Sequence, residues 1–333
     1  MRAWYLSESP GQYSIGEVAD PLPGPDEVRI AVRASALNHM DLWLTTCMPK
    51  PPRFPHGPGN DVAGVVESLG EGVTTWSLGD EVVVNTALVP DAALSRGVNS
   101  VLDPGMRLLG EHCWGGHGEF CVVPAHQLCA KPPERSWAEV ASYPVCTTTA
   151  WRLFRRADLQ AGESVLVTGI GGGVATAAFS LAQHLGCEVY VTSRDESKRQ
   201  RAIELGAAGA FDSSGPYPVT VDVVVDSIGP AVWDNAFRTL RHGGRMLVCG
   251  GTSGPKVELN LPRLFFKQLD VIGASCGSQV EFEHVSGLVA DGLPVIVDEV
   301  IPLAEYPRAL DRLREARQLG KIVLEHPIRR IGA

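Results

Sequence analysis

The stretch Val165-Leu-Val-Thr-Gly-Ile-Gly-Gly-Gly-Val-Ala175 decides the fold. It begins as a continuous apolar strand, turns at a cluster of glycines, and continues from Val174 with apolar residues at helical spacing. In the order strand, turn, helix, the first N–H groups of the helix and the positive end of its dipole lie beside the turn. The glycines of that turn let a pyrophosphate approach the backbone closely. The sequence therefore predicts a dinucleotide-binding turn, formed by Gly169, Gly171, Gly172, Gly173 and Val174.

Strands and helices alternate on the C-terminal side of this turn. The expected strands span 164–168, 188–192, 221–225 and 245–249, and the expected helices span 174–185, 196–205 and 233–240. Continuous β-branched strands that alternate with helices are typical of a parallel sheet covered on both faces. Residues 147–286 are therefore predicted to form an α/β domain with a doubly wound parallel sheet.

The end of the next strand indicates which dinucleotide is bound. An NAD site usually places an acidic residue roughly 20 residues beyond the turn, where it holds the ribose 2′-hydroxyl. Ser193 stands at that place, and Arg194 and Lys198 follow it. These three side chains can donate hydrogen bonds to a 2′-phosphate, so we expect NADP(H) as the cofactor. The alternative is that Arg194 and Lys198, beside Asp195, are only the solvated start of a helix.

Ligands of open α/β folds bind at the carboxyl ends of the strands. The ends of three later strands carry residues that are expected to lie beside the nicotinamide of the cofactor: Ser227, Cys249, Gly250, Gly251, Ala274 and Ser275. The segment 269–274 is also apolar and is expected at the edge of the sheet. Because exposed sheet edges pair readily, we predict a homodimer through the strand near Val271.

Composition and charge restrict the class of protein. The chain has 333 residues, 44% of them hydrophobic and 20% charged, which is typical of two globular domains. Its net charge of −9, with both signs mixed along the chain, argues against nucleic acid or an anionic membrane as a partner. Eight scattered cysteines without a C-x-x-C pair, and no secretory or membrane-spanning pattern, lead us to expect a cytoplasmic protein with reduced thiols.

The first third of the chain has a β pattern. Short strands are expected over 27–34, 62–67 and 80–85, separated by Pro and Gly clusters. Residues 87–107 lack periodicity and are expected to form a long loop. Beyond the α/β region, the pattern predicts a helix over 304–317 and a strand over 321–324.

Motifs in both parts of the chain resemble those of one family. They are Ala36-Leu-Asn-His-Met-Asp41, Gly59-Asn-Asp-Val-Ala-Gly-Val-Val66, Gly79-Asp-Glu-Val82, Gly115-Gly-His-Gly-Glu-Phe120 and Gly320-Lys-Ile-Val323. Together with the glycine turn, they make the chain similar to the medium-chain dehydrogenase/reductase superfamily along almost its full length. The resemblance implies a GroES-like, β-rich catalytic domain (1–146 and 287–333) around an inserted Rossmann domain, and a dimer through the edge strand.

The chain departs from the zinc alcohol dehydrogenases of that superfamily at their metal site. Asn38 stands where a Cys would be, and Asn60 and Asp61 stand where a His and a Glu would be. Amide oxygens and one carboxylate make a poor zinc site. Residues 87–107 also lack the four cysteines of the structural zinc lobe, so we expect no metal of either kind. The alternative left open is a non-standard metal site, with ligands from Asp41, Asp61, Cys146 or a nearby His.

Members of the superfamily that lack zinc and carry Asn at the first motif resemble quinone oxidoreductases and enoyl reductases, and this chain is similar to them by motif. Without a Lewis acid, acceptors that delocalise charge are favoured, so we expect NADPH to reduce a quinone or an α,β-unsaturated carbonyl. Asn38 is the first candidate to hydrogen-bond the developing enolate, and Asn60 is the second. Asp41 is the third catalytic candidate, although Asn38 and Asp41 also suit the cap of a short helix. Met40 stands at the family's proton-relay position, so water is the expected proton source.

The resemblance also implies contacts for residues around the reacting groups. These are His39, Lys321 and Thr149 on the cofactor, and Trp43, Trp114 and Cys146 around the substrate, with Cys146 also facing the nicotinamide. Both tryptophans suit a core as well as a pocket. Two other functions stay open, namely an alcohol dehydrogenase with a non-standard metal and a non-catalytic NADPH-binding relative.

Overall fold

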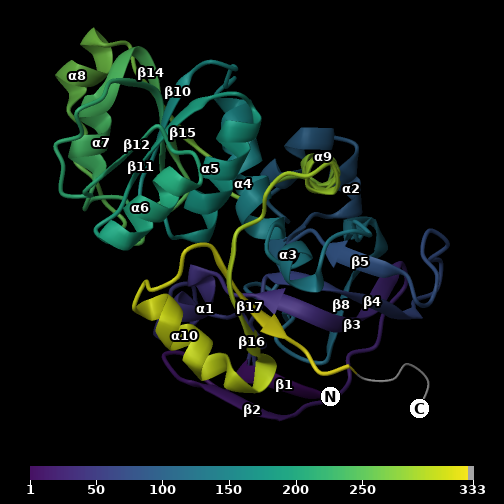
Figure 1. The fold of residues 1–333 in the computed structure, drawn as a ribbon. Helices are drawn as coiled ribbons and strands as arrows, with labels where there is room; N and C mark the ends of the chain where they lie inside the picture. Colours follow the sequence, from purple (N-terminus) through teal and green to yellow (C-terminus); the bar gives the residue numbers. More distant parts are fainter. Residues whose placement is uncertain (329–333) are drawn as a thin grey trace. The chain divides into compact units, whose positions relative to one another are not determined.

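The computed structural model describes residues 1–328 of the chain, which form two compact units (Figure 1). The first contains Met1–Val145 and the chain from Cys276 onward, and the second contains Cys146–Ser275. Each unit has its own sheet and its own buried core. Within the described residues, no helix has both the length and the apolar character needed to span a membrane.

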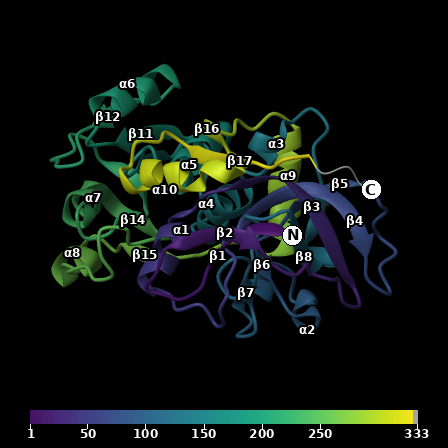
Figure 2. The ribbon, with the colours of Figure 1, turned by 90° about the horizontal axis from the view of Figure 1, so that it is seen from below.

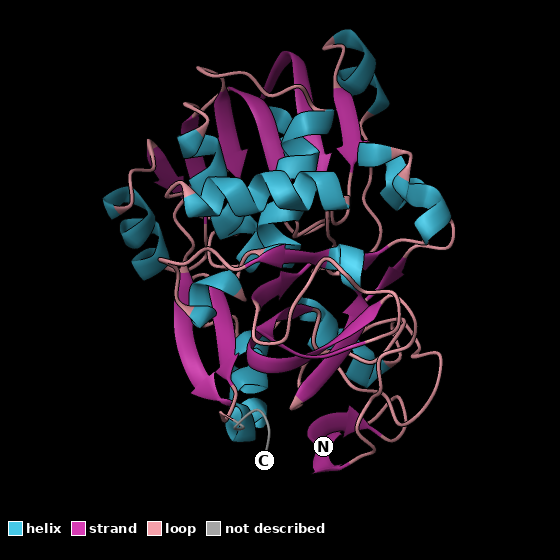
Figure 3. Cartoon of the chain, turned by 90° about the vertical axis from the view of Figure 1, so that its right-hand side faces the viewer, coloured by secondary structure: helices cyan, strands magenta, loops and turns pink. Residues whose placement is uncertain are grey.

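A six-stranded parallel sheet forms the second unit, in the order β12-β11-β10-β13-β14-β15. Its strands are β10 (Ser164–Val167), β11 (Glu188–Thr192), β12 (Gly209–Phe211), β13 (Val221–Asp226), β14 (Leu240–Val248) and β15 (Asp270–Gly273). The helices are α4 (Pro144–Arg156), α5 (Gly173–His184), α6 (Glu196–Glu204), α7 (Trp233–Thr239) and α8 (Leu261–Phe266). Figure 3 shows helices running across these strands. The prediction of an α/β unit with a doubly wound parallel sheet is confirmed.

Strand β13 illustrates why this sequence favours a central strand. Its three consecutive valines, 223–225, are almost completely buried, which requires packing on both faces of the sheet. Val224 belongs to one apolar cluster with Leu166 of β10 and with Trp233 and Phe237 of α7. The β-branched side chains fit the pleated strand, and the burial of both faces accounts for the absence of polar alternation.

The first unit is built on a seven-stranded, largely antiparallel sheet in the order β16-β17-β3-β4-β5-β9, with β8 paired to β3. Its strands are β3 (Glu27–Ala36), β4 (Asp61–Leu69), β5 (Glu81–Val84), β8 (Phe120–Pro124), β9 (Leu128–Ala130), β16 (Val297–Pro302) and β17 (Lys321–Glu325). A separate hairpin pairs β1 (Arg2–Leu6) with β2 (Tyr13–Glu17). The helices are α1 (His39–Trp43), α3 (Trp137–Val140), α9 (Gln279–Ala290) and α10 (Tyr306–Arg314), with 3-10 turns at Leu44–Thr46, Ala125–Gln127 and Leu303–Glu305.

Both ends of the chain contribute to this sheet. Strand β17 pairs antiparallel with β3 and parallel with β16. Strand β17 near the C-terminus, in yellow, and strand β3 near the N-terminus are therefore neighbours in this sheet, which Figure 2 shows from below. The expected helix over 304–317 is shorter in the structure and begins only at Tyr306.

Helix α9 belongs to the first unit, whereas the sequence assigned it to the second as far as residue 286. The hydroxyls of Tyr143 and Ser286 are 2.9 Å apart. Arg135 donates hydrogen bonds to the carbonyls of Val289 and Leu293, at 3.0 and 3.1 Å. Because these bonds tie α9 to the 135–143 segment, the change of unit falls at Ser275/Cys276 and not at 286/287.

The segment 87–107, expected as a long loop, has short elements of its own. They are β6 (Ala87–Leu88), α2 (Asp91–Leu94), a 3-10 helix (Gly97–Leu102) and β7 (Arg107–Leu108). Buried Ala87, Val89, Val101 and Cys276 form a small apolar core for the segment. Elements of two to six residues are too short to produce a periodic pattern, which is why the sequence did not predict them.

The central strand of the second unit provides a direct test of core packing. Leu166→Ala removes a fully buried side chain from β10, so it should lower the free energy of unfolding by about 2–5 kcal/mol. Leu22→Ala is the matched control, because Leu22 is 79% exposed and should change stability by less than about 0.5 kcal/mol. Denaturant unfolding measures both variants, and equal losses would contradict the assignment of Leu166 to the core.

Candidate active site

The glycine-rich turn joins β10 to α5 as the sequence predicts. Gly169 and Gly171 have φ values of +65° and +136°, which favour glycine. A Cβ on Gly169 would lie 2.7 Å from Ile228 Cδ1, so this position is also closely packed. Helix α5 begins after Gly172 with no side chain capping its N–H groups. This backbone fits the pyrophosphate of a dinucleotide, because helix N-termini bind anions.

The end of β11 gives the Ser193 region a defined conformation. Asp195 is the N-cap of α6 and accepts hydrogen bonds from the N–H groups of Ser197 and Lys198 at 2.8 and 3.4 Å. The Asp195 carboxylate is therefore already engaged in capping the N-terminus of α6. Ser193 is buried, and its hydroxyl accepts the N–H of Asp195 at 3.1 Å, while Arg194 is exposed.

Arg199 is a cation that the sequence reasoning missed at this strand end. Its guanidinium donates to the Ser193 carbonyl at 2.6 Å and to Asp212 at 3.1 Å. Lys198 is only 9% exposed at the same helix start. The sequence shows Arg199 as a basic residue in the first turn of α6. Its contact with the end of β11 depends on the direction in which α6 leaves the strand, which the sequence does not give.

The predicted residues after β13, β14 and β15 gather at the carboxyl ends of these strands. A Cβ on Gly250 would lie 2.9 Å from the Ser227 carbonyl oxygen, so the two loops touch. The N–H of Cys249 donates to the Asp226 carbonyl at 3.1 Å, and the N–H of Ala274 donates to that of Val248. The parallel sheet thus brings together three segments that are distant in sequence.

In the first unit, a buried lysine organises the first and second family motifs. Lys321 Nζ donates hydrogen bonds to the Leu37 carbonyl at 2.6 Å, to Asn38 Oδ1 at 2.8 Å and to Asp61 Oδ2 at 2.8 Å. Asn38 Nδ2 also donates to Asp61 Oδ2 at 2.8 Å, and the Val145 N–H donates to Asp61 Oδ1 at 2.8 Å. The side chains of Lys321 and Asp61 are 5% and 0% exposed, so this is a closed, buried ion pair.

This arrangement fixes the orientation of the Asn38 amide. An ammonium can only donate and a carboxylate can only accept, so Oδ1 must face Lys321 and Nδ2 must face Asp61. The same residues do not fit a catalytic zinc, because the ammonium already binds the oxygens that the metal would need. Among residues 1–328, no cluster of three or more His, Cys, Asp or Glu side chains could hold a metal.

Asp41 lies in a buried network and not in an open site. It is 1% exposed and accepts hydrogen bonds from the Asn38 N–H at 2.7 Å and from the Tyr306 hydroxyl at 2.9 Å. His117 Nε2 lies 3.0 Å from its carboxylate, and His117 Nδ1 continues to Ser35 at 2.8 Å. Burial alone would raise the pKa of Asp41, but His117 and these hydrogen bonds hold it below the ordinary value.

Asn38 and Asp41 also form the capping box at the start of α1, in which the Asp41 carboxylate accepts the Asn38 N–H. The cap of a short helix that the sequence suggested for these two residues is therefore present.

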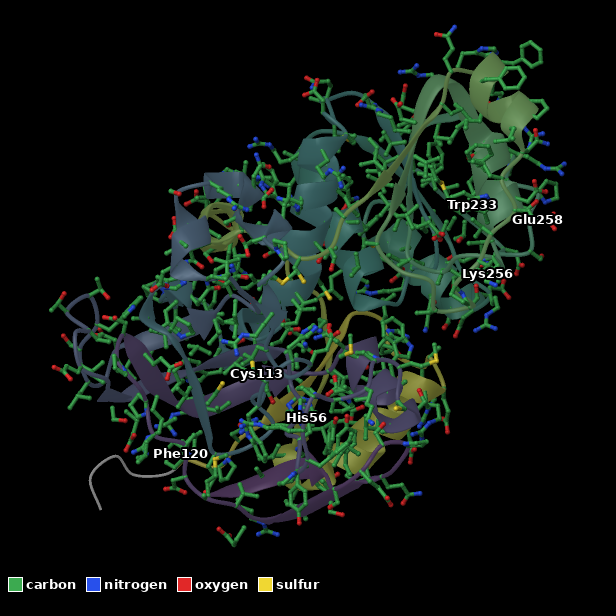
Figure 4. The ribbon with its side chains drawn as sticks, turned by 180° about the vertical axis from the view of Figure 1, so that it is seen from behind. His56, Cys113, Phe120, Trp233, Lys256 and Glu258 are labelled. Carbon is green, nitrogen blue, oxygen red and sulfur yellow. The ribbon has the colours of Figure 1, made fainter. Side chains whose placement is uncertain are left out.

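Asn60 and Trp114 both contact neighbouring segments of the first unit. Asn60 Nδ2 donates to the Leu109 carbonyl at 2.5 Å. Its Oδ1 is buried without a hydrogen-bond partner among the described residues. Trp114 is half-buried and packs against the apolar cluster that contains Phe120, and a Cβ on Gly57 would lie 2.4 Å from its ring. Phe120 is labelled in Figure 4.

The remaining predicted residues lie on α1 and α4. His39 is half-buried, burial and then Lys321 lower the pKa of its imidazole, and its ring lies 6.0 Å from that of Trp43. Cys146 and Thr149 are 3% and 4% exposed in α4.

His56, labelled in Figure 4, is buried and hydrogen-bonded to the Gly110 carbonyl at 3.0 Å. Burial lowers the pKa of His56, which suits a neutral loop histidine.

Comparison with known proteins places this geometry in a family. A family model described as alcohol dehydrogenase GroES-like domain matches residues 24–133, and one described as zinc-binding dehydrogenase matches residues 173–291. Acryloyl-coenzyme A reductase of Metallosphaera sedula is 28% identical and covers 94% of this chain and 96% of its own length. Quinone oxidoreductase of Mus musculus is also 28% identical, with 92% of each chain covered.

Solved structures agree over nearly the whole chain. An NAD-dependent alcohol dehydrogenase has a TM-score of 0.91 and 32% identity, with 98% of this chain and 99% of the other covered. The 2-octenoyl-CoA carboxylase reductase CinF, in complex with NADP and 2-octenoyl-CoA, has a TM-score of 0.88 and 26% identity, with 99% and 89% covered. The chain belongs to the medium-chain dehydrogenase/reductase superfamily, with the fold of the zinc alcohol dehydrogenases, and is an oxidoreductase of that family.

Proposed function

We propose that this protein is an NADPH-dependent oxidoreductase that reduces quinones or α,β-unsaturated carbonyls without zinc. The observation that carries the proposal is the Lys321 ammonium, which bonds both Asn38 and Asp61. These two residues stand at positions that the family's zinc site uses. The names of two relatives, quinone oxidoreductase and acryloyl-coenzyme A reductase, agree with acceptors that delocalise the negative charge formed when hydride is added.

Asn38 is the residue that we assign to the reacting oxygen. When bound, NADPH supplies the hydride that the β-carbon accepts, and water supplies the proton. The negative charge that then develops on the carbonyl oxygen needs a fixed hydrogen-bond donor. Lys321 and Asp61 hold the Asn38 amide in one orientation. One N–H of Nδ2 donates to Asp61, and we assign the second N–H of the same nitrogen to the carbonyl oxygen. A pre-oriented donor has no reorganisation cost during the reaction.

The cofactor preference follows from the end of β11. Ser193 replaces the acid that would hold a ribose 2′-hydroxyl, and Asp195 is engaged as the N-cap of α6. Arg194 and Lys198 are the cations that we assign to a 2′-phosphate, which guanidinium binds well. The NADP complex of CinF supports this choice, and the name of the NAD-dependent alcohol dehydrogenase keeps NAD(H) as the competing cofactor.

One experiment separates this proposal from its alternatives. Purified protein is assayed with NADPH and NADH against quinones, enones, 2-enoyl thioesters, aldehydes and ketones, and its metal content is measured on the same sample. Reduction of quinones or enones by a zinc-free sample is the expected result. One tightly held zinc per chain, with activity lost to a chelator, would establish the alcohol dehydrogenase with a non-standard metal. Cofactor binding without any turnover would establish the non-catalytic relative.

The 2′-phosphate assignment can be tested on its own. Arg194→Ala should weaken NADPH binding about ten- to a hundredfold and leave NADH binding nearly unchanged, because a charge-assisted bond is worth about 1.5–3 kcal/mol. Arg201→Ala is the control, since Arg201 is an exposed arginine of α6 that pairs with Glu204. Fluorescence titration measures both dissociation constants, and equal losses for the two cofactors would remove Arg194 from the site.

The role of Asn38 predicts a specific kinetic change. Asn38→Ala should lower kcat toward the best enone or quinone about a hundredfold, because one oxyanion donor is worth about that factor. The dissociation constant for NADPH should stay within twofold. Asn99→Ala changes an exposed asparagine of the 87–107 segment and is the control. An unchanged kcat in Asn38→Ala would exclude Asn38 as the donor.

A second copy of the chain is the partner that we propose. Strand β15 is the edge of the parallel sheet, and Val271 within it is 46% exposed. Phe265 and Phe266 of the preceding α8 are 60% and 73% exposed, which adds apolar surface next to the open strand edge. Exposed edges and apolar patches of this kind mark association surfaces.

The dimer prediction has a matched pair of valines. Val271→Lys should convert the dimer to a monomer, because a charge on the edge strand opposes strand pairing. Val300→Lys should leave the dimer intact, since Val300 is also 46% exposed but lies on β16, the edge of the other sheet. Light scattering after gel filtration measures the mass, and a monomeric unmodified protein would contradict the proposal.

A further inference from the structure

Strand β13 carries one aspartate near each end, and each is hydrogen-bonded to a hydroxyl at the corresponding end of β10, from Ser164 within the strand or from Thr168 directly after it. Asp222, near the start, accepts the N–H and the hydroxyl of Ser164 at 2.7 and 2.6 Å. Asp226, at the carboxyl end, accepts the hydroxyl of Thr168 at 2.6 Å. Because β10 and β13 are parallel neighbours, Asp222 lies at the end away from the glycine turn and Asp226 lies beside that turn.

Asp226 accepts hydrogen bonds from two segments. Besides Thr168, it accepts the N–H of Ile228 on Oδ1 at 3.0 Å and the N–H of Gly229 on Oδ2 at 2.9 Å. The residue is 0% exposed. Burial raises the pKa of this carboxyl, and the three hydrogen bonds oppose that shift. Burying a carboxylate is costly, and two of the three hydrogen bonds that offset this cost come from the 227–229 loop.

The loop that Asp226 holds touches the glycine turn directly. Ile228 Cδ1 lies 2.7 Å from the position that a Cβ on Gly169 would take, so Ile228 forms the wall behind the first glycine. On the opposite side, the Gly169 N–H donates to the Thr192 hydroxyl at 3.0 Å. The first residue of the turn is therefore held between the ends of β11 and β13.

The 227–229 loop is also held from its outer side. The Ser253 hydroxyl donates to the Ile228 carbonyl at 2.6 Å, and the Thr252 hydroxyl donates to the Ser227 carbonyl at 3.2 Å. The loop then leads into α7 through Trp233, labelled in Figure 4, whose N–H donates to the Gly229 carbonyl at 3.1 Å. The 227–229 loop is therefore hydrogen-bonded to Asp226 on one side and to Thr252 and Ser253, in the segment after β14, on the other.

We propose that Asp226 is a positioning residue for NADP(H), which fixes the 227–229 loop and the glycine turn in the conformation that receives the dinucleotide. This inference rests on the proposed cofactor site. Asp226 does not touch the cofactor, and it acts through Ile228 and Thr168. Asp222 is the comparison residue, because it makes similar hydrogen bonds at the other end of β13, away from the glycine turn. We expect Asp222 to contribute to folding but not to cofactor binding.

The test compares Asp226→Asn with Asp222→Asn in the full-length protein. In Asp226→Asn, one oxygen is replaced by an amide that must face the N–H of Gly229 or of Ile228, which places donor against donor. NADPH titration followed by fluorescence should give a dissociation constant at least tenfold weaker for Asp226→Asn. Asp222→Asn should stay within twofold of the unmodified protein, and thermal unfolding measures the stability loss of both.

Thr168→Val and Thr168→Ser provide a second, milder pair. Valine removes the hydroxyl that bonds Asp226 and keeps the shape, so NADPH binding should weaken threefold or more, and serine should restore it. This pair decides the question if Asp226→Asn does not fold. A folded Asp226→Asn, or a folded Thr168→Val in its place, with unmodified affinity would overturn the inference. Absence of NADPH and NADH binding by the unmodified protein would instead overturn the proposed cofactor site.

Discussion

The ion pair between Lys321 and Asp61 is the interaction on which the first unit depends. Its lysine comes from β17 near the end of the chain, and its aspartate begins β4 in the first third. Both charges are almost completely buried, so removal of either one would leave an uncompensated charge in the interior. The pair therefore ties the C-terminal strand to the two motif segments and sets the position of Asn38 at the same time.

The second unit obeys a comparable constraint at the carboxyl edge of its sheet. Parallel strands end on one side, and the polar groups exposed there need partners. Thr168 and Asp226 satisfy each other across neighbouring strands, and Thr192 accepts the N–H of Gly169. The glycine turn is thus not an isolated loop, since the ends of the neighbouring strands contact it.

Sequence reasoning succeeded where the signal is local. The glycine turn, the apolar strands around it and the helix starting near Gly173 follow from periodicity and from glycine's conformational freedom, and all are present. Contacts between residues that are distant in sequence could not be predicted in this way. Asp41 lies in a buried network with His117, which is 76 residues away along the chain and is brought beside it only by folding.

The sequence by itself determined the class of fold, the family motifs and the loss of the usual zinc ligands, because residue identity and spacing suffice for these properties. Only the tertiary structure decided which side chain contacts Asn38 and Asp61. Lys321 lies 260 residues from Asp61, and no spacing rule connects them. Their contact arises because β17 and β4 both pair with β3, which brings a C-terminal ammonium to the N-terminal carboxylate and amide. The orientation of the Asn38 amide follows from that pairing.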